Sequence, residues 1–337
     1  GRRPEENGNY SNKLRDAMIS VIIHEIGHNY FPMIVNSDER RWAWMDEGLN
    51  SFLQYLTEQS WQAGFPSRRG PAHKVFEYMQ SDKSDITPIM TDAESILHLG
   101  ANAYAKPATA LNILRESILG RDLFDFAFRE YAQRWEFKHP TPADFFRTME
   151  DASGIDLDWF WRGWFFTTDY VDLAISNARL YKIYQKEEDS KKRAPSTFRN
   201  SNQLANKDVQ LIEGMDLAFP VTFLEEIRFA DQVDALPPAE QKHWKEYDYY
   251  YELTIENRGG LIMPLVLLFE FRDGTTEKKN IPAEIWRRNN ESVTKVFSLN
   301  KEVVQITLDP YFEMGDVDMH NNRWPRNVSL PESRVFK

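Results

Sequence analysis

The chain has 337 residues, of which 42% are hydrophobic and 14% aromatic, so it holds enough apolar material for two domains with substantial cores. The chain is acidic, with a formal net charge of -11 and a pI near 5.3. This negative charge repels phosphate backbones, so we expect no nucleic-acid partner. The longest apolar stretch, Leu261 to Phe269, contains a proline and is too short for a bilayer, so no membrane span is expected.

The first half of the chain has a helical pattern. From Ser11 to about Tyr170 apolar residues recur at three- and four-residue spacing, the period of an amphipathic helix. Further along, Thr141 stands at a predicted N-cap, with Pro142 at the first helical position and Asp144 at the third. We therefore expect a mostly helical domain over residues 1–170.

The second half has the pattern of strands. Residues 171–245 begin with a strand-like alternation, continue into a charged polar stretch typical of a surface loop or insertion, and end in a predicted connecting helix around 225–245. Residues 246–337 contain several β-type segments between Asn, Gly and Asp turn signals. This spacing predicts a small antiparallel β-sandwich with a C-terminal tail, and an α+β fold class overall.

A short helical stretch, VIIHEIGHNYF at residues 21–31, carries two histidines four residues apart. At that spacing the imidazoles of His24 and His28 project from one face and can hold one cation. Glu25 lies beside this face and suits a general base. Because the chain has no cysteine, any metal must be bound by His, Asp or Glu. The alternative is an ordinary core helix with two satisfied polar residues.

The third ligand separates these alternatives. Zinc peptidase sites use three protein ligands and leave a fourth position for water or substrate. The short metzincin pattern would need a glycine and a histidine where the chain has Phe31 and Ile34. Instead Glu47 follows, with eighteen residues between it and His28, at the start of a second amphipathic pattern. A carboxylate there can meet the histidine pair where the two helices pack.

With these residues the sequence resembles the aminopeptidase N-like gluzincins, a family of thermolysin-like zinc metallopeptidases. His-Glu-x-x-His, eighteen residues and Glu form their zinc signature, and Trp44, Glu47 and Gly48 match the Trp-x-x-Glu-Gly around their third ligand. The resemblance implies one Zn²⁺ per chain, bound by His24, His28 and Glu47, with Glu25 as the base.

The residues that orient the histidines remain open. Thermolysin-type relatives place an aspartate four residues after the ligand glutamate, and this chain has Ser51 there. Asp46 or a residue elsewhere could take that role.

The family also supplies a tyrosine that stabilises the oxyanion, in a Tyr-x-Lys-Gly-Ala or Ser motif. The chain has Tyr104, Lys106 and then Pro107 in place of the glycine, just before a predicted helix. Proline is tolerated in a first helical turn, where no amide donor is needed. The resemblance therefore implies a catalytic role for Tyr104, whereas the alternative is a tyrosine that only packs its ring in a core.

The similarity extends from about Arg15 to Trp164 and includes the family's helical lobe. One expected element is absent from the chain: the Gly-x-Met-Glu-Asn motif, whose glutamate holds the substrate's free α-amine upstream of the zinc helix. We expect an upstream segment of the same protein to complete the catalytic domain. The resemblance also favours an extracytoplasmic location for this protein, either periplasmic or secreted.

These observations predict a zinc-dependent peptide hydrolase that releases N-terminal residues, with zinc and Glu25 activating a water and Tyr104 stabilising the oxyanion. Its expected partners are peptide substrates. Two alternatives stay open at this point. The same chemistry could serve endopeptidase cleavage or the epoxide hydrolysis of one family branch, or the protein could be a non-catalytic binding scaffold with the same fold.

Overall fold

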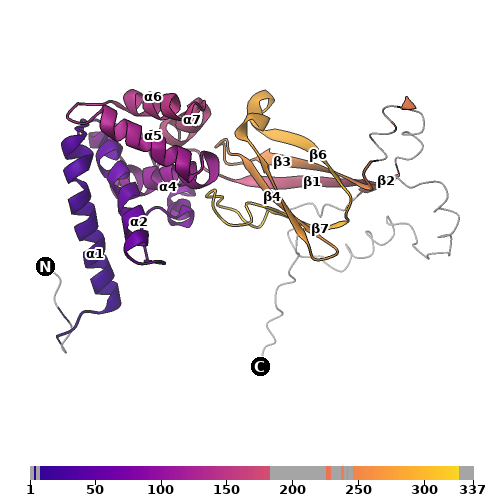
Figure 1. Cartoon of the computed structure of the whole chain (residues 1–337), viewed down its shortest axis with the longest axis horizontal. Helices are drawn as coiled ribbons and strands as arrows, with labels where there is room; N and C mark the ends of the chain where they lie inside the picture. The colour runs from indigo at the N-terminus through magenta and orange to yellow at the C-terminus, as the bar shows by residue number, and fades with distance from the viewer. Residues whose placement is uncertain are drawn as a thin grey trace.

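The computed structural model describes residues 4, 8–182, 225–228, 237–238, 241 and 246–325. Helices occupy the first half of this part of the chain and strands the second, so the α+β class predicted from the sequence is what the structure shows. In Figure 1 the helices and the sheets lie at opposite ends of an elongated molecule, and α1 forms the outer edge of the helical end.

The α-helices agree with the helical period of the first half, and several are joined by 3-10 or π-helical turns. In chain order they are α1 (Asn12–Gly27), α2 (Leu49–Trp61), α3 (Phe76–Met79), α4 (Lys106–Ile113), α5 (Arg121–Arg134), α6 (Pro142–Ser153) and α7 (Asp158–Phe166). The predicted start of α6 is confirmed. Thr141 and Asp144 form a reciprocal capping box around Pro142, and Gly154 ends the helix with a left-handed φ of 69°.

The strands form two four-stranded sheets. They are β1 (Leu173–Lys182), β2 (Glu225–Arg228), β3 (Tyr249–Asn257), β4 (Leu265–Phe271), β5 (Thr276–Ile281), β6 (Ser292–Leu299), β7 (Val303–Leu308) and β8 (Arg323–Trp324). One sheet has the order β2-β1-β3-β6 and the other the order β5-β4-β7-β8. All of these pairs are antiparallel except β1 with β2, which is parallel.

The two sheets contact each other through buried aromatic side chains. The rings of Phe269 on β4 and Phe297 on β6 lie 5.1 Å apart, and the Tyr251 hydroxyl on β3 accepts a 2.8 Å hydrogen bond from the Val303 amide on β7. β1 pairs with β3 along its whole length. The strand that opens the second half is thus part of this assembly and does not stand alone.

The segment between β1 and β3 agrees with its prediction only in part. Where a connecting helix was predicted around 225–245, the segment begins with strand β2, paired with β1, whereas Pro238 and Gln241 are helical and the Gln241 amide donates to the Pro237 carbonyl at 3.0 Å. Most of the rest of that segment, and the charged stretch before it, lie outside the described residues.

The helical half is built around aromatic side chains from α5, α6 and α7. Trp44 is fully buried among them, with its ring 5.7 Å from Phe145, 5.9 Å from Phe146 and 4.8 Å from Phe165. Such rings bury large apolar areas and hold their neighbours in defined geometries. Trp44 therefore fixes the start of the segment that leads into α2.

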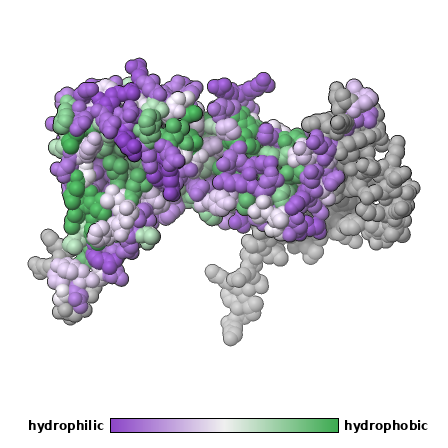
Figure 2. All heavy atoms as spheres, in the orientation of Figure 1, coloured by the Kyte–Doolittle hydropathy of each residue, from purple (hydrophilic) through white to green (hydrophobic). Residues whose placement is uncertain are grey.

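One face of α1 is both apolar and exposed. Met18, Val21, Ile22 and Ile26 are 46%, 50%, 49% and 64% exposed, and Figure 2 shows the resulting apolar strip along the helical edge of the molecule. None of the helices in the described part of the chain has the length and apolarity needed to cross a membrane.

Candidate metal centre

The two histidines of the motif lie at the end of α1 with their rings together. His24 belongs to the last turn of the helix and is buried, and His28 is its C-cap. Their Nε2 atoms are 3.2 Å apart, and the rings meet nearly edge to face. The expectation that both imidazoles project from one face of a helix is therefore confirmed.

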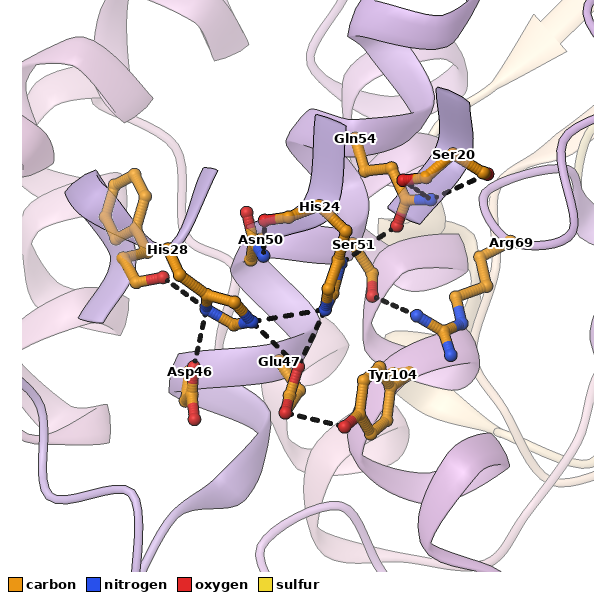
Figure 3. Close-up of polar contacts among 11 residues, drawn as sticks. Ser20, His24, His28, Asp46, Glu47, Asn50, Ser51, Gln54, Arg69 and Tyr104 are labelled. Carbon is orange, nitrogen blue, oxygen red and sulfur yellow. Dashed lines mark hydrogen bonds and ion pairs between the residues drawn. The ribbon is translucent and has the colours of Figure 1, made fainter. Parts of the chain in front are cut away.

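Glu47 reaches these histidines from a π-helical turn, Trp44–Gly48, that runs directly into α2. Its Oε2 atom lies 3.0 Å from His24 Nε2 and 3.4 Å from His28 Nε2. One ligand atom from each of the three residues falls within 4.8 Å of the others, and Figure 3 shows the three side chains converging. The sequence predicted this trio, and the fold brings it together.

The close packing of α1 on α2 depends on a glycine. Asn50, which is 1% exposed, donates from Nδ2 to the His24 carbonyl at 2.8 Å. A Cβ at Gly27 would stand 1.9 Å from Asn50 Oδ1, closer than any side chain permits. Gly27 therefore lets the helix of the histidines approach the helix of the carboxylate.

Side chains around the trio fix the orientation of each imidazole. Gln54 on α2 places Oε1 2.9 Å from His24 Nδ1, while its Nε2 donates to the Ser20 carbonyl at 3.2 Å and to Glu58 Oε1 at 2.8 Å. These two acceptors define which end of the amide faces His24. Gln54 is seven residues after Glu47, on the same face of the helix, a spacing from which the sequence could have suggested it.

His28 is oriented by two oxygens at its other ring nitrogen. Its Nδ1 atom lies 2.9 Å from the Phe31 carbonyl and 3.0 Å from Asp46 Oδ1. Asp46 was one of the alternatives that the sequence left open. The backbone carbonyl could not be found from residue types, because any residue provides one.

The donor set fits a zinc ion. With acceptor oxygens at both Nδ1 atoms, each imidazole can carry its proton there, which would leave the Nε2 lone pair for a metal. His24 Nε2, His28 Nε2 and Glu47 Oε2 lie 3.0 to 3.4 Å from one another, close enough for one cation to contact all three. Two imidazole nitrogens and one carboxylate oxygen are ligands that zinc prefers.

The electrostatics of the two neighbouring carboxyl groups differ. Burial raises the pKa of Glu47, yet its contacts with His24 and Tyr104 outweigh burial and hold this pKa below its ordinary value. Glu47 is thus ionised at neutral pH, the form that binds metal. Burial and the charge of Glu47 raise the pKa of Asp46 to about 7, although His28 opposes this.

Tyr104 joins the ligand cluster through Glu47. It lies in a π-helical turn, Gly100–Ala105, and its hydroxyl donates to Glu47 Oε1 at 2.6 Å while its ring stacks on His24 at 5.8 Å. Burial, and then the hydrogen bond to Glu47, raise the pKa of the phenol, so it keeps its proton and can donate it in a hydrogen bond.

The residues after Tyr104 hold its segment in place. Lys106 is 1% exposed, and its Nζ donates to the Thr167 carbonyl beyond α7 at 3.3 Å. Pro107 packs on Gly48, where an added Cβ would stand 2.6 Å from the proline Cγ and 3.0 Å from the Ala103 carbonyl oxygen. Gly48 therefore allows the tyrosine segment to come within hydrogen-bond reach of Glu47.

Glu25 is the motif residue that does not join this cluster. Its side chain is exposed on α1 and, within the described part of the chain, makes no hydrogen bond or ion pair. It borders the same exposed face as Ile22 and Ile26. A base that acts on a water must be open to it, so the exposure suits the role.

Arg69 is close to the cluster and was not anticipated from the sequence. Its guanidinium lies over the Tyr104 ring at 4.1 Å from the centroid, and its Nη1 donates to Ser51 Oγ at 3.2 Å, as Figure 3 shows. The loop between α2 and α3 carries this arginine. Only the tertiary structure could bring that loop over Tyr104.

A second group of carboxylates, Glu150, Asp156 and Asp158, also places its oxygens within 4.8 Å of one another. Glu150 accepts from the Leu157 amide at 2.9 Å, and Asp156 accepts from the Asp158 amide at 3.1 Å. Asp156 and Asp158 are exposed. Two of the three carboxylates therefore accept amide hydrogen bonds at the start of α7, a role that needs no metal.

The part of the chain that carries this site matches a known protein family. Residues 5–164 match the Peptidase family M1 domain, a stretch that contains the trio, Glu25 and Tyr104 and covers the predicted similarity from Arg15 to Trp164. The helical half thus carries a domain of the metallopeptidase class. This part of the chain is thus similar to peptidase family M1, and relatives that share it include proteins named aminopeptidase N and glutamyl aminopeptidase.

Relatives share this stretch at low identity. Glutamyl aminopeptidase of Sus scrofa is 27% identical over 176 residues, which are 50% of this chain and 18% of the relative. Aminopeptidase N of Lactococcus lactis is 25% identical over 168 residues, or 46% of this chain and 19% of the relative. The chain therefore spans about a fifth of the length of these relatives.

Among solved structures, Legionella pneumophila aminopeptidase A in complex with aspartic acid aligns with 88% of this chain and 26% of its own, at 14% identity and a TM-score of 0.49. A likeness at that level defines neither substrate nor activity.

Removal of the carboxylate ligand should separate metal binding from chemistry. Glu47→Ala should release zinc, whereas Glu25→Gln should retain it, because only Glu47 belongs to the converging donor set. Metal analysis of the two purified variants beside the parent protein checks this. Full zinc occupancy in Glu47→Ala would show that the ligand assignment is wrong.

Gly48→Ala tests the approach of the tyrosine segment. The new methyl group would overlap Pro107, so we expect a loss of about 1 to 3 kcal/mol of unfolding free energy and a lower turnover. Gly100→Ala is the matched control, since a Cβ there meets no atom within 4 Å. Denaturant unfolding measures both variants, and equal stabilities would contradict the packing role of Gly48.

Proposed function

We propose that this chain carries the metal ligands and catalytic residues of a zinc-dependent aminopeptidase. The observation that carries the proposal is the convergence of His24, His28 and Glu47, with the Tyr104 hydroxyl 2.6 Å from the third ligand. One zinc ion per chain fits the three donors. When bound, zinc supplies Lewis acidity that makes a water acidic enough to attack near neutral pH.

The protein residues divide the remaining work. Glu25 accepts the proton of the attacking water and passes it to the leaving amine, a role open to an exposed carboxylate beside the ligands. Tyr104 keeps its proton and donates a hydrogen bond to the oxyanion that develops on the scissile carbonyl. Gln54 and Asp46 hold the two imidazoles in position.

The catalytic domain extends beyond the described helices in this proposal. Residues 1–170 would be the helical part of a thermolysin-like domain, 171–245 a connecting part, and 246–337 a β-sandwich. An upstream segment of the same protein would cover the apolar exposed face of α1, which borders Glu25. Such a segment would also supply the wall that orients the peptide and the carboxylate that holds its free amine.

Loss of the tyrosine hydroxyl should affect turnover and leave the metal in place. Tyr104→Phe removes one donor, so zinc content and folding should survive while kcat falls by about 10² to 10³, the usual cost of an oxyanion donor. Steady-state kinetics and metal analysis check the variant together. A change in KM alone would make Tyr104 a binding or packing residue.

The aminopeptidase assignment itself is tested with blocked substrates. Intact protein should cleave aminoacyl anilides that have a free α-amine and reject the same compounds after N-acetylation, because acetylation removes the positive charge and leaves a buried carboxylate unpaired. The 337-residue chain alone should be deficient in both assays even when it binds zinc. Equal cleavage of free and acetylated substrates by intact protein would favour the endopeptidase alternative.

A further inference from the structure

Arg69 presents a positive charge beside the residue that is proposed to bind the oxyanion. Its guanidinium lies over the Tyr104 ring, 4.1 Å from the ring centroid. Its Nη1 donates to the hydroxyl of Ser51 on α2 at 3.2 Å, and Ser51 is fully buried. The next residue, Gly70, has a φ of 98°, and a Cβ there would stand 2.3 Å from the Tyr55 ring. The loop is therefore fixed where Arg69 turns toward the site.

The charge of Arg69 has no carboxylate partner within the described part of the chain. Ser51 is a neutral acceptor, and the carboxylates whose charges act on Arg69, Glu47 and Glu58, form no ion pair with the guanidinium. Burial lowers the pKa of Arg69, but a guanidinium stays charged in any protein environment. A partly buried cation that has carboxylates nearby but no direct ion pair can still bind an anionic ligand that completes the pair.

We propose that Arg69 binds the side-chain carboxylate of the substrate and selects peptides whose N-terminal residue is acidic. The inference rests on the proposed aminopeptidase function. The scissile carbonyl would lie at the Tyr104 hydroxyl, and Arg69 stacks on that same ring, so the guanidinium would lie near the side chain of the substrate's N-terminal residue. The planar guanidinium matches a carboxylate with two parallel hydrogen bonds.

Ser51 keeps the cation available in this proposal. The side chain at this position lies 3.2 Å from Arg69, so a carboxylate there would form an internal ion pair and neutralise the arginine. Serine anchors the guanidinium without cancelling its charge. The departure from the thermolysin-type aspartate at this position thus gains a physical reason.

The experiment compares glutamyl and glutaminyl p-nitroanilide, two substrates of nearly equal size that differ in charge, with zinc-loaded intact protein. The parent should prefer the glutamyl substrate in kcat/KM. In Arg69→Met this preference should fall by about 10- to 100-fold, the range for a hydrogen bond to a charged group. Ser51→Asp should also abolish it, whereas Arg69→Lys should restore part of it.

Arg68→Met is the matched control, because Arg68 is the exposed neighbour and its loss should leave the preference unchanged. A glutamyl-to-glutaminyl ratio that stays constant in Arg69→Met, with kcat lowered for both substrates, would overturn the proposal and make Arg69 a positioning residue for Tyr104.

A binding measurement separates this proposal from the function on which it rests. Calorimetry with L-glutamate and L-glutamine should show tighter binding of glutamate to the parent and equal binding of both to Arg69→Met. If the parent hydrolyses no aminoacyl anilide, the proposed function fails while this measurement still decides the role of Arg69. Equal binding of both amino acids by the parent would overturn the role of Arg69 alone.

Discussion

The arrangement of the helical half depends on the convergence of three polar atoms that could share one cation. His24 Nε2, His28 Nε2 and Glu47 Oε2 lie 3.0 to 3.4 Å from one another, and each Nδ1 atom faces an oxygen that can accept its proton in a hydrogen bond. A cation among them would attract all three atoms. The binding energy of a metal would then also stabilise the packing of α1 on α2.

The rest of the helical half supports that convergence through close packing. Gly27 lets Asn50 bond to the His24 carbonyl, and Gly48 lets Pro107 press against the turn that carries Glu47. Trp44 anchors the same turn among aromatic rings. These contacts involve buried and rigid groups. A small displacement of those groups would therefore move His24, His28 and Glu47 out of the arrangement that a metal ion requires.

Charges around the centre are distributed unequally. The side of His24 that faces away from the ligands leads through Gln54 to the buried Glu58 and Ser20, a network of hydrogen bonds that fixes the imidazole. On the side of Tyr104 the guanidinium of Arg69 has a hydroxyl as its acceptor and no carboxylate within the described residues. One side of the centre is thus held by a hydrogen-bond network, while the other has a guanidinium that forms no ion pair with the described residues.

The sequence alone indicated which three side chains converge at the candidate metal centre, because helical periodicity fixes how residues four apart project and because the spacing to Glu47 is long enough for a second helix to return. It also determined the helical first half, the capped start of α6 and the place of Tyr104 before α4. These features depend on local conformation, which residue type and spacing control.

Only the tertiary structure decided which groups surround the ligands. Arg69 reaches Tyr104 from a loop, the Phe31 carbonyl is a backbone atom, and β2 pairs with β1 where a helix was expected. Such contacts join segments far apart in the chain, and their formation depends on how whole elements pack. No local pattern encodes that packing, so residue types and spacing could identify the three converging side chains and Asp46 as one alternative beside them, but not the rest of their surroundings.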